Sequence, residues 1–294
     1  MERLSRTVLR PSETTLAVRG SHSRGLLNHK RPSLLARRSW ASHWDEGTRG
    51  FPGQTRLLNL ASPLLSSLSS VICVQTEDRV IALTFDDGPD PRFTPLVLDA
   101  LAMTGTRATF FLLSSAGRRY PALVQRAVAE GHEIALHGVD HSRTTTWRAR
   151  EAAERLSSGK TELEDVAQVA VTLYRPTYGA QRLNLVRAAR RLGLETVIWS
   201  GWAQDWRGDA PAEVTARAVR ACHPGGILLL HDTLAGLDDG VDPEIFSPEV
   251  TTRLLQHLRR ETWEFATVSE LLDTYQHVRS AWFERPDLKR SQPS

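Results

Sequence analysis

Asp86 and Asp87 stand side by side in the segment TFDDGP at residues 84–89. The preceding apolar residues 79–83 indicate a buried strand, and the Gly-Pro pair indicates a turn. Side chains within a regular strand alternate between faces, but at its end, before a glycine, both carboxylates could bend toward one site. Two such carboxylates repel unless a cation or a proton separates them. Solvated residues in a strand-end turn are the better explanation of this segment alone, so a site requires further ligands elsewhere.

Two histidines, His137 and His141, could be those ligands. Positions i and i+4 on a helical turn, or in a tight loop of similar reach, face the same way and can share a metal. The spacing by itself also fits two surface histidines near a loop. Joined with Asp87, the pair gives three protein ligands with a fourth position left to water, which is typical of catalytic zinc. Such a metal lowers the pKa of its water, toward which Asp86 would act as the general base.

A third histidine, His231, follows the apolar run GILLL at residues 226–230. A leaving amine must be protonated, and histidine is the natural acid near neutral pH. Asp205 is the preferred carboxylate partner for its imidazolium. Asp232 is the rival, although it follows His231 directly and points the other way if the strand continues. A core histidine with a satisfied ring remains the alternative.

A fixed cation, Arg175, opens the segment RPTYG at residues 175–179. Arg175 could pair with Asp86 and keep that carboxylate ionised. The Pro and Gly shape a loop whose backbone N–H groups could meet a developing oxyanion. A structural salt bridge beside a turn explains the segment equally well.

The elements that must position these side chains alternate between strand and helix from residue 77 onward. Strands are expected at 80–85, 108–113, 133–136, 171–174, 196–199, 227–230 and 265–268. Helices are expected at 94–103, 120–129, 147–169, 183–192, 212–221, 248–262 and 270–275. This alternation predicts an α/β fold with a parallel sheet, either doubly wound or closed as a barrel. The candidate residues follow the strands, and strand C-termini open onto the face that carries the active site.

With these motifs in order, the chain resembles the NodB-type polysaccharide deacetylases, carbohydrate esterase family 4. Residues 84–89 are similar to that family's first motif, in which the first Asp is the catalytic base and the second a metal ligand. His137 and His141 match its H-[S/T]-x-x-H zinc motif. Residues 175–179 are similar to its R-P-P-Y-G motif, in which the Arg positions the base and the Tyr backbone N–H, here of Tyr178, helps form the oxyanion hole.

Two later motifs extend the resemblance. Asp205 and Trp206 are similar to the D-W motif of the family, and residues 230–232 to its L-H-D motif, which brings the catalytic acid and a pocket-lining Leu, here Leu230. The resemblance implies a NodB homology domain, a distorted (β/α) barrel with about seven parallel strands. Two departures stand out. Gly138 replaces the usual Ser or Thr, which removes a hydrogen bond that steadies the metal loop, and Thr177 replaces the second Pro, which loosens the oxyanion loop.

These observations predict a hydrolase that removes acetyl groups from an N-acetylated or O-acetylated glycan of the peptidoglycan or chitin type. The expected cofactor is Zn²⁺, or another divalent ion such as Co²⁺ or Ni²⁺, bound by Asp87, His137 and His141. Tyr178, Trp202 and Trp206 are candidates for stacking on a sugar ring, although packing at the barrel rim explains them equally well. Two alternatives are a relative that hydrolyses a cyclic imide or ureide and a non-catalytic glycan-binding protein.

Composition sets the wider expectations. Residues 1–77 hold 11 basic and 5 acidic residues, so the rest of the chain carries a net charge of −3, which argues against a nucleic-acid partner. We expect a basic, disordered leader at 1–77 with a signal-like segment at 57–74, a catalytic domain at 78–278 and a polar tail at 279–294. No apolar run long enough to cross a membrane occurs. We expect a monomer, and a cell-envelope or secreted location over a cytoplasmic one.

Overall fold

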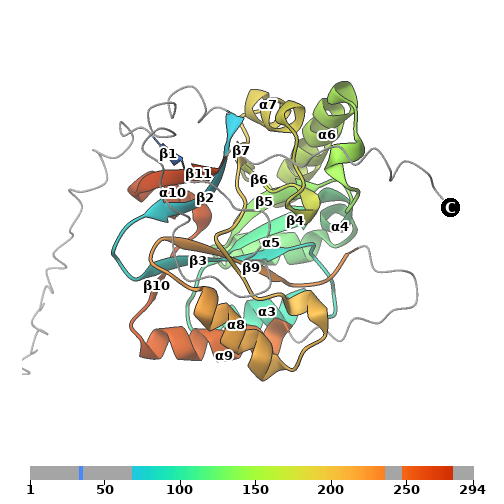
Figure 1. The fold of residues 1–294 in the computed structure, drawn as a ribbon. Helices are drawn as coiled ribbons and strands as arrows, with labels where there is room; N and C mark the ends of the chain where they lie inside the picture. Colours follow the sequence, from blue (N-terminus) through green and yellow to red (C-terminus); the bar gives the residue numbers. More distant parts are fainter. Residues whose placement is uncertain (1–32, 36–67, 236–246, 281–294) are drawn as a thin grey trace, which may run out of the picture.

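The computed structural model describes residues 33–35, 68–235 and 247–280, and within them one curled sheet organises the chain (Figure 1). Its strands, in spatial order, are β1 (Leu34–Leu35), β11 (Gln276–Ser280), β2 (Ser70–Gln75), β9 (Gly226–His231), β3 (Val80–Asp86), β4 (Thr109–Leu113), β5 (Glu133–Gly138), β6 (Leu173–Tyr174) and β7 (Glu195–Thr196). Two short strands lie off this path: β8 (Gly201–Trp202) pairs with β9, and β10 (Glu264–Phe265) pairs with β3.

The sheet is mostly parallel and curls toward closure. The strands from β9 through β3 to β7 all pair in parallel, whereas β2 is antiparallel to both β9 and β11. Beyond β7, Val197 forms a single parallel bridge with Val71 of β2. The predicted fold class, a distorted (β/α) barrel, is therefore confirmed.

Helices lie on both sides of this sheet: most of them cover its outside, and the last one, α10, packs against the side chains of its inner face (Figure 1). They are α3 (Thr94–Ala102), α4 (Ser114–Arg119), α5 (Pro121–Ala129), α6 (Ala149–Ala167), α7 (Leu183–Arg191), α8 (Pro211–Ala221), α9 (Ser247–Arg260) and α10 (Val268–Thr274). Four of them, α3, α5, α8 and α9, carry a proline in their first two positions, where its missing N–H costs no intrahelical hydrogen bond. None of the described helices is both long and apolar enough to cross a membrane.

Side chains along each strand alternate between the two faces of the sheet. This alternation produces two apolar clusters, one on each face, and determines the face on which each polar residue lies. In β3, Ile81, Leu83 and Phe85 pack with the outer helices, whereas Ala82 belongs to the inner cluster. Asp86 continues the inner series of β3. By the same period of two, Ala135 and Ile227 lie in the inner cluster. His137, the next-to-last residue of β5, and His231, the last residue of β9, therefore lie on the same inner face. Each of these three parallel strands thus places one polar side chain on the inner face of the sheet, near its C-terminal edge.

The strand β2 differs from expectation. Part of the predicted signal-like segment, residues 70–74, forms a buried strand between β9 and β11. A short continuous apolar run fits a buried strand as well as a helix, and only the pairing partners, more than 150 residues away, distinguish them. Residues 57–67 of that segment, and residues 1–32 and 36–56 of the predicted leader, lie outside the described residues.

The C-terminal elements also differ in detail. Residues 266–268 were expected to continue a strand, but Val268 begins α10, because Thr267 and Glu270 form a reciprocal capping box. Strand β11 extends to Ser280, two residues past the predicted domain end, and the predicted tail beyond it lies outside the described residues. Helix α4 was not predicted. Cys73 and Cys222 are both free thiols.

Candidate active site

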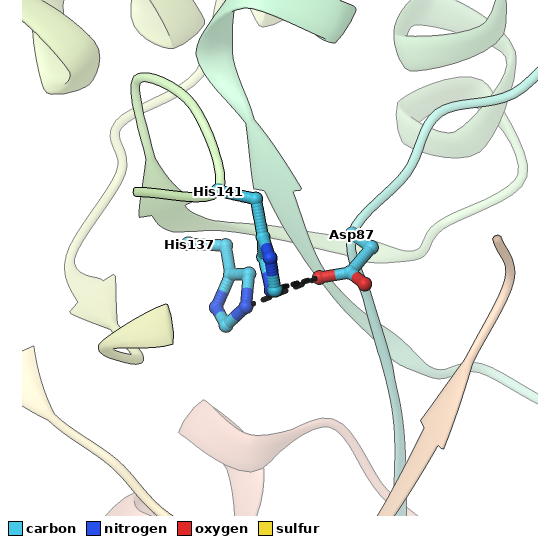
Figure 2. Close-up of side chains that lie close together, drawn as sticks. All are labelled: Asp87, His137 and His141. Carbon is cyan, nitrogen blue, oxygen red and sulfur yellow. Dashed lines mark ion pairs between the residues drawn. The ribbon is translucent and has the colours of Figure 1, made fainter. Parts of the chain in front are cut away.

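Asp87, His137 and His141 converge at the C-terminal edge of the sheet (Figure 2). The Asp87 Oδ1 atom lies 3.3 Å from Nε2 of His137 and 3.2 Å from Nε2 of His141. One possible ligand atom from each residue lies within 4.8 Å of the other two. Asp87 and His137 are buried, and His141 is half-buried. The structure therefore brings together the three residues that the sequence suggested as metal ligands.

The polar atoms of this group fit a cation. Asp87 Oδ2 accepts a hydrogen bond from the Ala235 N–H at 3.0 Å, but Oδ1 is buried and has no hydrogen-bond partner. An unpartnered carboxylate oxygen is costly to bury unless a cation meets it. Ligand atoms about 2.0–2.1 Å from a tetrahedral zinc ion lie about 3.3 Å apart, which matches the two separations measured from Oδ1.

The two histidines are oriented differently. His137 Nδ1 lies 2.9 Å from the Arg175 carbonyl oxygen, and because a carbonyl only accepts, Nδ1 carries the proton and Nε2 is left with its lone pair toward Asp87. His141 Nδ1 is buried and has no hydrogen-bond partner.

A local backbone feature lets the adjacent carboxylates share one site. Asp86 is the last residue of β3 and points inward by alternation, so Asp87 in regular strand geometry would point outward. Instead Asp87 has φ of 79°, a left-handed value that non-glycine residues rarely adopt. This turn brings the carboxylate of Asp87 to the same side as that of Asp86, as the sequence led us to expect.

Asp86 is held by a buried arginine. Arg175 Nη1 donates to Asp86 Oδ1 at 2.6 Å and to Thr84 Oγ1 at 2.8 Å, and the guanidinium is fully buried. Its Nη2 donates to the Ile198 carbonyl at 2.9 Å, and its face lies 3.9 Å from the Phe111 ring centroid. The other carboxylate oxygen, Oδ2, lies 3.9 Å from His137 Nδ1. Arg175 thus engages one oxygen and leaves the second toward the metal ligands.

His231 and Asp205 form the second polar pair. His231 Nδ1 lies 2.8 Å from Asp205 Oδ1, and the His231 backbone N–H donates to Oδ2 at 2.7 Å. Burial lowers the pKa of His231, but the charge of Asp205 and its hydrogen bond dominate and raise that pKa to about 10. In the β3–β9 ladder His231 is the direct neighbour of Asp86, so the histidine and the carboxylate pair face one space.

The rival carboxylate, Asp232, has a different role. Its Oδ1 accepts the Gly88 N–H at 3.1 Å and its Oδ2 accepts the Thr94 hydroxyl at 2.5 Å. A Cβ atom added to Gly88 would lie 2.1 Å from Asp232 Oδ2, which explains why glycine follows the two aspartates. The Asp232 carboxylate therefore anchors the turn after β3, and the partner of the His231 ring is Asp205. Burial raises the pKa of Asp232 to about 7.

Aromatic side chains line two sides of this space. Tyr178 is 51% exposed and its ring centroid lies 4.3 Å from that of His141. Trp206 is 39% exposed, and its ring centroid lies 5.5 Å from that of His231 and 5.1 Å from that of Trp202.

One predicted residue is not at the site. Leu230 precedes His231 on β9, points to the opposite face and is buried in the outer cluster.

Two site contacts were missed in the sequence. Thr84 lies two residues before Asp86 and therefore on the same inner face, a signal that strand alternation contains. Ala235 meets Asp87 through a backbone N–H, and no side-chain pattern could have indicated that contact.

Comparison with known sequences shows which protein family this chain resembles. The family described as polysaccharide deacetylase matches residues 74–197. A peptidoglycan-N-acetylglucosamine deacetylase of Bacillus cereus is 33% identical over 207 residues, which cover 69% of this chain and 92% of the relative. The chain belongs to the polysaccharide deacetylase family. The peptidoglycan-N-acetylglucosamine deacetylase PgdA of Listeria monocytogenes is also 33% identical, over 72% of this chain but only 43% of the longer relative.

Solved structures of the family agree in fold. A crystal structure of a peptidoglycan N-acetylglucosamine deacetylase has a TM-score of 0.64 and 28% identity, covering 70% of this chain and 93% of that one. A family 4 acetyl xylan esterase from Clostridium thermocellum, in complex with a cobalt ion, has a TM-score of 0.59 and 26% identity, covering 66% and 90%. The prediction of a NodB-type polysaccharide deacetylase, and hence of a hydrolase, is confirmed.

Proposed function

We propose that this polysaccharide deacetylase hydrolyses the acetamide of N-acetylated amino sugars in a peptidoglycan-type glycan. The observation that carries the proposal is the unpartnered Asp87 Oδ1 facing two imidazole nitrogens, with the Asp86 and His231 side chains beside it. Peptidoglycan is preferred over chitin because the relatives from Bacillus cereus and Listeria monocytogenes, named for that substrate, match over 207 and 216 residues, whereas two chitooligosaccharide deacetylases match over 181 and 159. In the reaction water adds to the acetyl carbonyl carbon, the C–N bond breaks, and acetate and a free amine leave.

Asp87, His137 and His141 would hold the divalent ion. Two imidazoles and one carboxylate suit zinc, and the similar esterase that holds cobalt supports the same class of ion here. When bound, such an ion acts as a Lewis acid that polarises the acetyl carbonyl and makes water a better nucleophile at neutral pH. The Arg175 carbonyl fixes the His137 ring so that its Nε2 lone pair points to the ion.

Asp86 would remove the proton from the attacking water. Its Oδ1 is occupied by Arg175, so Oδ2 is the oxygen that accepts the proton. The Arg175 guanidinium is itself fixed by a carbonyl and by the Phe111 ring, so the base has one orientation. Asp86 is buried, so bulk water does not compete for the proton that Oδ2 accepts.

His231 would protonate the departing amine. Because Asp205 occupies Nδ1 and raises the pKa to about 10, the ring is an imidazolium at neutral pH with its Nε2 proton free to be donated. Tyr178 would offer its backbone N–H to the oxygen that gains negative charge, and its position beside the His141 ring supports that role. Tyr178 and Trp206 would stack on the sugar from opposite sides, with Trp202 behind Trp206.

The experiment that tests this proposal measures acetate released from N-acetylglucosamine oligomers and from peptidoglycan fragments. We expect release by the metal-loaded protein, loss of release after chelation, and recovery when zinc or cobalt is added back. Tight glycan binding without acetate release, across several divalent metals, would instead identify a non-catalytic glycan-binding protein. Turnover of cyclic imides or ureides with no release from either glycan would identify the other alternative.

Asp205→Asn is expected to move the alkaline limit of activity to lower pH. His231 must be protonated to act as the acid, and the charge of Asp205 is what raises its pKa to about 10. Without that charge the pKa of His231 falls, so kcat/KM should decline about 1–3 pH units earlier on the alkaline side.

The measurement is the pH profile of kcat/KM for both proteins. Asp209→Asn serves as the control, since Asp209 is four residues away and pairs with Arg217. An alkaline limb that stays in place in Asp205→Asn, or that moves equally in Asp209→Asn, would argue against His231 as the acid.

A further inference from the structure

The two histidines of the metal group depend on different kinds of support. His137 lies at the end of β5, and its Nδ1 is fixed by the Arg175 carbonyl. His141 lies beyond the strand, in a loop, and its Nδ1 has no hydrogen-bond partner. A metal-ligating histidine is normally oriented through its second ring nitrogen. The direction of His141 therefore comes from the Asp87 carboxylate and the Tyr178 ring that it contacts, and from the backbone on either side of it.

That backbone is tied to the protein on both sides of His141. Before it, the Val139 carbonyl accepts the Ser115 N–H at 3.0 Å. After it, the carbonyl of Ser142 accepts a hydrogen bond from the Thr177 hydroxyl at 2.7 Å, and Thr177 is fully buried. This second tie is made directly after His141, by the residue that precedes Tyr178. It is also a side-chain contact that one substitution can remove.

Within the loop, Asp140 adds a further constraint. Its Oδ1 accepts the Ser142 N–H at 3.0 Å and its Oδ2 accepts Arg155 Nη2 at 2.5 Å. These bonds shape residues 140–142 and connect them to α6. They do not connect the loop to residues 175–179, on which Arg175 and Tyr178 lie. Thr177 makes that connection at Ser142.

The start of the loop cannot provide this support through a side chain. Gly138 has φ of 152°, a conformation that L side chains rarely adopt, and a Cβ atom there would lie 3.0 Å from the Asp140 carbonyl oxygen. The sequence had led us to expect a loosened metal loop and a loosened oxyanion loop, because residues 138 and 177 both depart from the family pattern. Instead, the residue at 177 bonds the two loops together.

We propose that Thr177 is a positioning residue for the metal ligand His141, acting through its hydroxyl on the Ser142 carbonyl. This inference rests on the proposed function, since it assumes that His141 binds the ion. Thr177 places the His141 backbone relative to Tyr178, so it aligns a metal ligand with the neighbouring oxyanion donor. Its loss should weaken metal binding first and leave the rest of the fold intact.

The experiment measures the zinc dissociation constant of purified protein by competition with a chromogenic chelator. Thr177→Val keeps the branched shape and removes the donor, and we expect zinc to bind about 10-fold to 100-fold more weakly. Thr177→Ser keeps the hydroxyl and should bind zinc within about threefold of the wild type. Cobalt-substituted proteins provide a second readout: the visible absorption bands should change in Thr177→Val and not in Thr177→Ser.

Thr144→Val is the matched control. The buried Thr144 hydroxyl donates to the Ala180 carbonyl at 2.6 Å, so it also links the two loops, but three residues after His141. Metal-free melting temperatures of both Val variants report the general cost of losing such a bond. We expect comparable melting temperatures, with weakened zinc binding in Thr177→Val alone.

Each outcome has a definite consequence. The positioning role would be overturned if Thr177→Val bound zinc as tightly as the wild type. It would also be overturned if Thr144→Val lost as much zinc affinity as Thr177→Val. If Thr177→Val is insoluble, Thr177→Ala replaces it, with the same expected loss and the same criterion. Failure of the wild-type protein to bind any divalent ion would overturn the proposed function itself, which separates the two results.

Discussion

Asp86→Asn is expected to lower kcat for acetate release by about 10²–10⁴-fold while zinc remains bound. The amide cannot accept the proton of the attacking water, but it has nearly the shape of the carboxylate and can still accept the Arg175 hydrogen bond through its oxygen. The three residues that would hold the ion are unchanged. The measurement combines single-turnover or steady-state acetate release with metal analysis of the same sample.

The matched control for this variant is Asp87→Asn, at the neighbouring position. It removes charge from the oxygen that faces both imidazoles, so it should lose the metal as well as the activity. We therefore expect both variants to be inactive, but Asp86→Asn should retain its bound metal and Asp87→Asn should not. Asp86→Asn protein that retains full activity would refute the base role, and loss of metal in that variant would place Asp86 among the ligands.

Arg175→Met is expected to reduce the free energy of unfolding by about 3–5 kcal/mol, in addition to abolishing activity. Both the guanidinium and Asp86 are buried, so removal of the cation leaves a carboxylate without its charge partner. The two carbonyl contacts of Arg175 and its contact with Phe111 are lost in the same change. Chemical denaturation of the metal-free proteins gives the difference directly.

The double variant Asp86→Asn/Arg175→Met tests whether the cost comes from the ion pair. If the unpaired charge causes most of the loss, replacing Asp86 by a neutral amide should recover part of the stability that Arg175→Met removes. Strictly additive losses would show that Arg175 contributes mainly through packing and its carbonyl contacts.

Much of the fold could be predicted because its signals are local. The core strands β3, β4, β5 and β9 are short apolar runs that end at a turn or a polar residue, and the expected ranges differ from the observed ones by one or two residues. The helix starts at α3, α5 and α8 follow from their prolines. The strand β2 could not be predicted, since its partners β9 and β11 lie far along the chain.

The site divides in the same way. The sequence was enough to predict which groups reach the catalytic edge. Asp86, His137 and His231 lie at the C-terminal ends of parallel strands, and alternation along each strand places their side chains on the inner face. The same alternation places Leu230 in the outer cluster, so its predicted role in the pocket was wrong for a reason already present in the strand pattern.

The contacts that hold those groups in place form only in the folded protein. The positive φ of Asp87, the contact of its carboxylate with the Ala235 N–H, and the bond from Thr177 to Ser142 depend on loops that meet only after folding. Residue types and spacing encode which face a strand side chain occupies, because that is set by a period of two. They do not show which loops meet. Every residue has a backbone carbonyl and nearly every residue a backbone N–H, so residue type does not identify the partners in such contacts.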